Sequence, residues 1–139
     1  MSKTFLLKLI APDGVKYQEE ATEVVLPTEN GQIEVLPGHM PLVALLKPGE
    51  IIIRNGDKEH FLATEGGIAQ ISQNLVKILA DTAEDADSLD ELAIVEAKKV
   101  AQERLANAKD EVEFTEAQAL LEKQLAKLNI LTKRKKYRR

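Results

Sequence analysis

Hydrophobic residues recur at two different spacings along this chain of 139 residues, and the spacing changes at residues 81–88. Before this stretch they alternate with polar residues, as in Gln32-Ile33-Glu34-Val35-Leu36, which is the period of a strand with one buried face. After it they recur every third or fourth residue, which is the period of a helix. The pattern predicts an α+β protein with a β domain at residues 1–87 and a helical domain at residues 88–139.

Turn residues divide the first half into short segments with alternating or β-branched residues. Asp13-Gly14, Asn30-Gly31 and Asn55-Gly56 each favour a tight turn, because asparagine, aspartate and glycine tolerate left-handed backbone. Turn signals about every 8–12 residues are typical of an all-β sandwich, and we expect about ten strands. Pro27 is expected to end one of these strands, and Gly66-Gly67 to allow a bulge or a close approach of two backbones.

The second half is predicted to form an antiparallel pair of helices joined by a short turn at residues 109–112. Ser88 followed by Glu91 is a capping-box pattern that should start the first helix. Each helix carries one apolar stripe, formed by Ile94, Ala97, Ala101, Leu105 and Ala108 in the first and by Phe114, Ala117, Leu121, Leu125, Leu128 and Leu131 in the second. A seam rich in alanine buries little apolar surface. We therefore expect a weakly held hairpin, with the acidic residues 81–88 as a solvated hinge.

The composition excludes several classes of function. The chain has no cysteine, and neither His39 nor His60 has an acidic cluster at metal-ligand spacing beside it, so we expect no metal site. No nucleophile elbow or phosphate-binding loop is present, so we expect no catalysis by the chain alone. No apolar run approaches the roughly 20 residues that a membrane-spanning helix needs, and no signal segment precedes the first strand pattern.

Basic residues are concentrated toward the C-terminal end, although the net charge is -4. Residues 1–87 hold 7 basic and 14 acidic residues, whereas residues 88–139 hold 12 and 9, and six basic residues lie in the last seven. Two interpretations stay open for this terminal run: complementing the dipole of a helix, or docking on an acidic protein surface. Tyr137 is its one aromatic residue and offers no stacking platform, so we expect no nucleic-acid partner. Nucleic-acid binding by this tail is the weakest alternative, and it predicts a steep salt dependence and loss of binding when residues 133–139 are deleted.

Residues 31–42, with the sequence GQIEVLPGHMPL, and residues 46–49 closely resemble the epsilon subunit of F-type ATP synthases. Residues 66–69, 76–80 and 89–91 follow in that family's order, so the resemblance covers essentially the whole chain. It implies a non-catalytic rotor subunit of a proton-translocating ATP synthase, in which the β-sandwich packs on the gamma subunit and couples c-ring rotation to gamma. It also implies a peripheral subunit on the cytoplasmic face of a bacterial plasma membrane, with the plastid thylakoid as second choice, that meets the membrane only through the complex.

The resemblance assigns residues to two interaction sites. The c-ring contact loop corresponds to Glu29, Asn30, Gly31 and Gln32, with His39 close after it in sequence. The C-terminal helices of this family inhibit ATP hydrolysis when they extend into the catalytic head. Their contacts with the alpha and beta subunits would be made here by the basic residues Lys123, Lys127, Lys133, Arg134, Lys135 and Lys136.

Many bacterial relatives bind ATP through an Ile/Leu-Asp-x-x-Arg-Ala motif. Glu84, Leu89 and Asp90 match that site here, but Ala93 stands at the arginine position and Ile94 at the alanine position. A charge-assisted contact of the missing kind is worth about 1.5–3 kcal/mol, so we expect no cofactor and at most a vestigial ATP site.

One alternative comes from a different class of protein. It is a β-sandwich ligand-binding module whose helical hairpin serves only to oligomerise. Co-purification with gamma favours the rotor subunit, and self-association without gamma favours the binding module.

Overall fold

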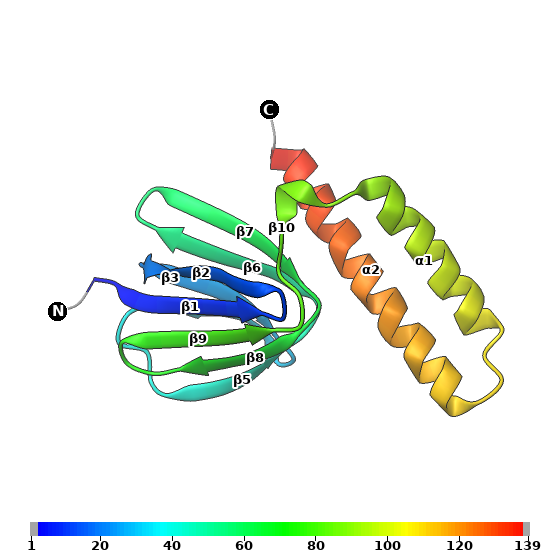
Figure 1. Cartoon of the computed structure of the whole chain (residues 1–139), viewed down its shortest axis with the longest axis horizontal. Coiled ribbons are helices and arrows are strands. Elements are labelled where there is room, and N and C mark those ends of the chain that lie inside the picture. Colours follow the sequence, from blue (N-terminus) through cyan, green and yellow to red (C-terminus); the bar gives the residue numbers. More distant parts are fainter. Residues whose placement is uncertain (1–2, 138–139) are drawn as a thin grey trace. The chain divides into compact units, whose positions relative to one another are not determined.

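The computed structural model of the chain describes the backbone of residues 3–137 and the side chains of residues 3–134. The chain divides into two compact units, Met1–Asp85 and Ala86–Arg139. Figure 1 shows the first unit as layers of strands and the second as two helices. The expected α+β fold class is confirmed.

The strands of the first unit follow the turn signals of the sequence. They are β1 (Phe5–Ala11), β2 (Gly14–Ala21), β3 (Glu23–Thr28), β4 (Gly31–Val35), β5 (Leu42–Leu46), β6 (Gly49–Asn55), β7 (Lys58–Thr64), β8 (Gly67–Ile71), β9 (Leu75–Ala80) and β10 (Glu84–Asp85). They pair in the order β10-β7-β6-β3-β5-β8-β9-β1-β2, with β4 on β3. Within the described residues, the expected sandwich of about ten strands is therefore confirmed.

The core of the first unit is built from every second residue of its strands. In β1, Phe5, Leu7 and Leu9 are buried, whereas Leu6 between them is exposed. Alternation of this kind follows from the pleat of a strand, which sends successive side chains to opposite faces. The largest fully buried side chains are Leu7, Leu9, Leu26, Ile51, Ile53, Ile78, Val24, Val35 and Val76.

Gly67 marks a close approach of two strands, as the sequence predicts. Its φ is +146°, a conformation that residues with a side chain rarely adopt. A Cβ atom at this position would lie 2.2 Å from the carbonyl oxygen of Leu79 and 2.8 Å from the Cα atom of Ala80. Only glycine lets β8 pair with β9 at this distance.

The prediction that Pro27 ends a strand is wrong. β3 continues through Pro27, which is in register with Gln32 of β4, and the Pro27 carbonyl accepts a hydrogen bond from the Lys47 amide at 2.9 Å. Proline lacks the backbone N–H donor but keeps its carbonyl acceptor. It is therefore tolerated in a strand at a position where no N–H is needed for pairing. Gly49 makes room for the ring, since a Cβ there would lie 2.7 Å from the Cβ of Pro27.

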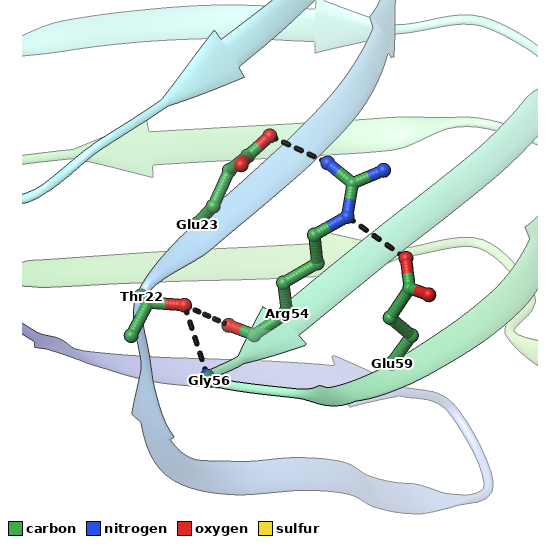
Figure 2. A network of polar contacts seen from close by, with 5 residues as sticks. All are labelled: Thr22, Glu23, Arg54, Gly56 and Glu59. Atoms are coloured by element: carbon green, nitrogen blue, oxygen red, sulfur yellow. Dashed lines mark hydrogen bonds and ion pairs between the residues drawn. The ribbon is translucent and has the colours of Figure 1, made fainter.

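Arg54 joins two neighbouring strands and a loop at one corner of the sandwich (Figure 2). Its Nε donates a hydrogen bond to Glu59 at 2.9 Å and its Nη1 to Glu23 at 2.7 Å. The hydroxyl of Thr22 donates to the Arg54 carbonyl at 3.0 Å and accepts from the Gly56 amide at 3.3 Å. The hydrogen bond to Glu59 is the main cause that raises the pKa of Arg54 above its ordinary value. These contacts hold the β6–β7 hairpin against the start of β3.

The expectation of a solvated hinge at residues 81–88 is wrong in part. Glu84 and Asp85 form β10, which pairs antiparallel with β7. Ala83 is 6% exposed and belongs to the sandwich core, and Ala86, at the start of the 3-10 helix η1 (Ala86–Ser88), is 1% exposed. Alanine is small enough to be buried at an acidic strand end, and the charge of this stretch hid that possibility from the sequence.

The second unit contains helices α1 (Glu91–Ala106) and α2 (Glu111–Tyr137). Ser88 does not cap α1, because it belongs to η1; Asp90 is the N-cap, and its Oδ1 accepts a hydrogen bond from the Ala93 amide at 3.2 Å. Asp110 acts in the same way for α2 by accepting from the Glu113 amide at 2.8 Å. Neither described helix is long and apolar enough to cross a membrane.

The predicted apolar stripe of α1 is confirmed. Ile94 and Ala101 are buried, and Ala97, Leu105 and Ala108 are half-buried, although Ala108 lies just beyond the end of the helix. Two of the five side chains reach the size of leucine. The seam that α1 offers to α2 is therefore narrow.

The predicted stripe of α2 is only partly right. Ala117 is buried as expected, but Phe114 and Leu125 are 47% and 45% exposed. Gln124 and Ile130 are buried instead. Leu121, Leu128 and Leu131 are half-buried. The covered side of α2 therefore overlaps the predicted stripe without matching it, and part of the helix's hydrophobic surface remains uncovered.

Candidate functional site

The sandwich carries an exposed apolar surface on the strands β5, β8, β9 and β1, which lie side by side (Figure 1). Leu45 is in register with Ile68, Ile68 with Leu79, and Leu79 with Ile10, so these four side chains form one row across four strands. Cross-strand partners share a face of the sheet. We call the exposed side of these strands the outer face; its apolar residues are Leu6, Ile10, Val43, Leu45, Ile68, Leu75 and Leu79.

These side chains are unusually accessible for their size. Val43 is 68% and Leu45 is 52% exposed, while Ile68 and Leu79 are 40% and 43% exposed. Single exposed leucines are ordinary, but a contiguous apolar patch marks an interaction site. The alternation of polar and apolar residues does not predict this surface. Its signal was present in runs such as Ile78-Leu79-Ala80, which are apolar on both faces of a strand.

The predicted c-ring loop is the two-residue turn between β3 and β4. The hydroxyl of Thr28 donates a hydrogen bond to the Gly31 carbonyl, and Gly31 has a φ of +115°. The Glu29 amide donates to the carbonyl of Leu45 at 3.0 Å. Glu29 and Asn30 are both exposed, so a rigid turn presents one carboxylate and one amide to solvent.

A groove of about 300 Å³ begins at this turn and follows β5. It exists because β5 meets β3 at a single register pair, Thr28 with Leu46, so that β4 and β5 are not paired with each other. Its lining is mostly apolar and consists of Thr28, Glu29, Asn30, Ile33, Leu42, Val43, Ala44 and Leu45.

His39 lies away from the turn. Gln32 is at the start of β4, whereas His39 follows its end, and the four steps between Gly31 and Val35 span about 13 Å. The Gly38 amide donates to the Gln73 carbonyl at 3.2 Å, which ties this loop to the β8–β9 turn. The imidazole Nδ1 of His39 is 2.7 Å from the carbonyl oxygen of Met40. The fold therefore holds His39 and the turn at opposite ends of β4.

The basic residues proposed from the resemblance follow α2. Lys123, Lys127 and Arg134 are half-buried and recur at intervals of four and seven, so they lie along one side of the helix. Lys133 is exposed. The side chains of Lys135 and Lys136 lie outside the described residues.

The residues that match an ATP site belong to different units. Glu84 is in β10 of the first unit, whereas Leu89 and Asp90 precede α1 in the second. The Asp90 carboxylate is engaged by the Ala93 amide, and Ala93 offers no positive charge for a phosphate. Among the described residues, no group of three or more histidine, aspartate or glutamate side chains could hold a metal ion.

The helical unit also contains a pocket, of about 250 Å³, at the end where the two helices are joined. Arg104 and Asn107 line it together with Glu113 and Glu116. Two carboxylates beside one guanidinium give the pocket no excess of positive charge. Its electrostatics therefore do not favour a phosphate ligand.

Comparison with known proteins gives consistent similarities. Residues 4–86 match the family model described as ATP synthase, Delta/Epsilon chain, beta-sandwich domain. The chain is 38% identical over 128 residues to the ATP synthase epsilon chain of Acidithiobacillus ferridurans, covering 92% of this chain and 91% of that protein.

Two solved structures share the fold. A chain in the cryo-EM structure of the Euglena gracilis mitochondrial ATP synthase, OSCP/F1/c-ring in rotational state 1, has a TM-score of 0.85 and 23% identity, over 94% of this chain and 83% of that chain. A chain in the Tetrahymena thermophila mitochondrial ATP synthase central stalk and c-ring has a TM-score of 0.66 and 14% identity, over 92% and 96%.

Proposed function

The chain belongs to the epsilon-chain family of ATP synthases, and from this we propose that it is a non-catalytic subunit of the rotor. In this proposal it lies in the central stalk, binds gamma, and couples rotation of the c-ring to gamma. It takes part in proton transport only as a mechanical link. It needs no cofactor, and it reaches the membrane as a peripheral subunit on the cytoplasmic face, through the complex.

The outer face is the observation that carries this proposal. Seven apolar side chains on one side of four strands remain accessible to a partner, and the sheet beneath them is rigid because its other side is the sandwich core. A torque-transmitting contact requires such a broad surface on a stiff element. We assign this face to gamma.

The turn at Glu29 and Asn30 and the adjacent groove are proposed to meet the c-ring. The turn is short and fixed by hydrogen bonds at both ends, so it can transmit force without bending. The apolar side chains of the groove that do not belong to the outer face, Ile33, Leu42 and Ala44, add a surface that a c-ring loop could cover. His39, at the other end of β4, would touch the ring only if the contact extended along the whole strand.

The helical hairpin is proposed to inhibit ATP hydrolysis by extending toward the alpha and beta subunits. Its buried apolar side chains are few, namely Ile94 and Ala101 of α1 and Ala117 and Ile130 of α2, and two of the four are alanine. Separation of the helices therefore exposes a limited apolar surface, which limits its cost in free energy. Lys123, Lys127 and Lys133 supply positive charge that would orient the helix on acidic surfaces of the catalytic head.

Truncation after Ser88 tests the two parts of the proposal separately. We expect the truncated chain to bind gamma as the full chain does, while ATP hydrolysis by the assembled enzyme rises. Unchanged hydrolysis would refute the inhibitory role and leave the stalk role standing. Self-association of the full chain without any binding to gamma would refute the stalk role and favour the ligand-binding module.

ATP binding is tested by calorimetry on the isolated chain. We expect no binding at low-millimolar ATP, because Ala93 removes the arginine that the family motif supplies. The variant Ala93→Arg is the matched control, since residue 93 is exposed and the change adds only the missing charge. A micromolar isotherm from the unaltered chain would contradict the expectation.

A further inference from the structure

Two lysines lie beside each other on the β9 and β1 side of the outer face. Lys8 of β1 is in register with Lys77 of β9 in a parallel pair of strands, which are about 4.8 Å apart. Leu7 and Leu9 on either side of Lys8 are buried in the core, so Lys8 points outward with Lys77 beside it. Like charges directly opposite each other in a sheet are destabilising. This arrangement therefore has a cost in the free chain.

The pair is framed by apolar residues along both strands. On one side Leu6 is in register with Leu75, and on the other Ile10 is in register with Leu79. All four belong to the outer face. The two ammonium groups therefore form a small island of positive charge within a surface that is otherwise suited to burial.

Nothing described in the chain neutralises this island. Across the sheet, Lys77 faces Gln70 of β8 and Lys8 faces Gln18 of β2, both uncharged. The nearest acidic position is Glu20, which is diagonal to Lys8, and the ion pairs of the described residues include neither lysine. Both lysines are only half-exposed, because their stems lie on the sheet.

Docking of an apolar partner would bury two like charges, which is strongly unfavourable unless the partner supplies the opposite charge. A carboxylate placed between the two ammonium groups would neutralise both and relieve their repulsion. Building on the proposed docking of gamma, we propose that Lys8 and Lys77 together receive an aspartate or glutamate side chain of gamma. The apolar frame specifies where the partner binds, and the lysine pair fixes its register.

A binding titration tests this with the full-length chain and a gamma-containing catalytic head depleted of its own epsilon chain. The variant Lys8→Met/Lys77→Met keeps the length of both side chains and leaves the carboxylate of gamma buried without a partner. We expect its Kd to rise at least 30-fold, and Lys77→Glu alone to raise Kd at least 100-fold. Lys58→Met, on β7 and outside the outer face, is the control and should change Kd less than twofold.

Two further readouts separate recognition from folding. Removing the like-charge repulsion should leave the thermal midpoint of the double methionine variant equal to or above that of the natural chain, although its binding is weaker. The Kd of the natural chain should rise with salt, and that of the double variant should rise less. A variant that unfolds at a lower temperature would mean that the lysines stabilise the sheet, which contradicts the proposal.

The two proposals fail in different ways. If the natural chain does not bind the gamma-containing head, the stalk assignment fails. If the natural chain binds and the double methionine variant binds equally well or better, the stalk assignment stands, but the proposed contact between the two lysines and a carboxylate of gamma is refuted. A carboxylate on gamma whose neutralisation weakens binding to the natural chain, but not to the double variant, would identify the partner residue.

Discussion

Replacement of Gly67 by alanine should destabilise the sandwich by about 2–6 kcal/mol. Two effects contribute. A φ of +146° strains any residue with a Cβ, which costs about 1–3 kcal/mol. In addition, the new Cβ would lie 2.2 Å from the Leu79 carbonyl oxygen, and relief of such a clash with backbone costs a further 1–3 kcal/mol or so. Backbone cannot rotate aside as a flexible side chain can, so β8 and β9 must separate locally.

Gly14→Ala is the matched control for this prediction. Gly14 has a φ of +133°, close to that of Gly67, but no atom lies within 4 Å of the position of its Cβ. It should therefore show the strain alone, about 1–3 kcal/mol. The difference between the two variants measures the clash.

The assay is urea unfolding followed by NMR signals of buried methyl groups in the sandwich, such as those of Ile78. A probe confined to the sandwich is needed because the chain has two units and need not unfold in one step. The free energies of unfolding are compared between variants whose free energy falls with urea concentration at the same slope. If Gly67→Ala costs no more than Gly14→Ala, the reasoning from the close approach of the strands is refuted.

Other properties of the chain can be tested in the same way. Arg54→Met should lower the free energy of unfolding by about 0.5–1.5 kcal/mol, a modest loss because its guanidinium is partly exposed; no loss in urea titrations would contradict a role for this corner. Asp90→Ala should cost about 1 kcal/mol of α1 stability, seen as faster amide exchange in the first turn, whereas Asp90→Asn should retain most of it. The Lys16 hydrogen bond lowers the pKa of Asp13 below its ordinary value, so its contribution to stability is present above the unfolded-state pKa and is lost as pH falls through the folded-state pKa. NMR titration should find that lowered pKa and its return toward the ordinary value in Lys16→Met; an unchanged pKa would contradict this.

The helical unit illustrates how far a local pattern can be followed. The stripe of α1 was predictable because its apolar residues and its buried residues coincide. The stripe of α2 was predictable only in part: Ala117 is buried and Leu121, Leu128 and Leu131 are half-buried, but Phe114 and Leu125 are exposed. Gln124 is buried although it is polar. A periodicity identifies a helix, but the partner surface selects which side of that helix is covered.

The sequence by itself determined the division into a sheet half and a helical half, the number of strands and the turns between them. These features depend on hydrophobic period and on glycine, asparagine and proline, which act within a few residues. The family resemblance also located the Glu29 turn and the basic residues of α2.

Only the tertiary structure decided what the strands place together. β1 and β9 lie at opposite ends of the first unit in sequence, yet they pair in parallel and bring Lys8 beside Lys77. The outer face likewise requires the register of four strands, and the burial of Ala83 requires a sheet edge for β10 to join. The physical reason is that strand pairing is a non-local contact. The alternation within a strand fixes which side a residue faces, but it contains no information about which strand will lie next to it.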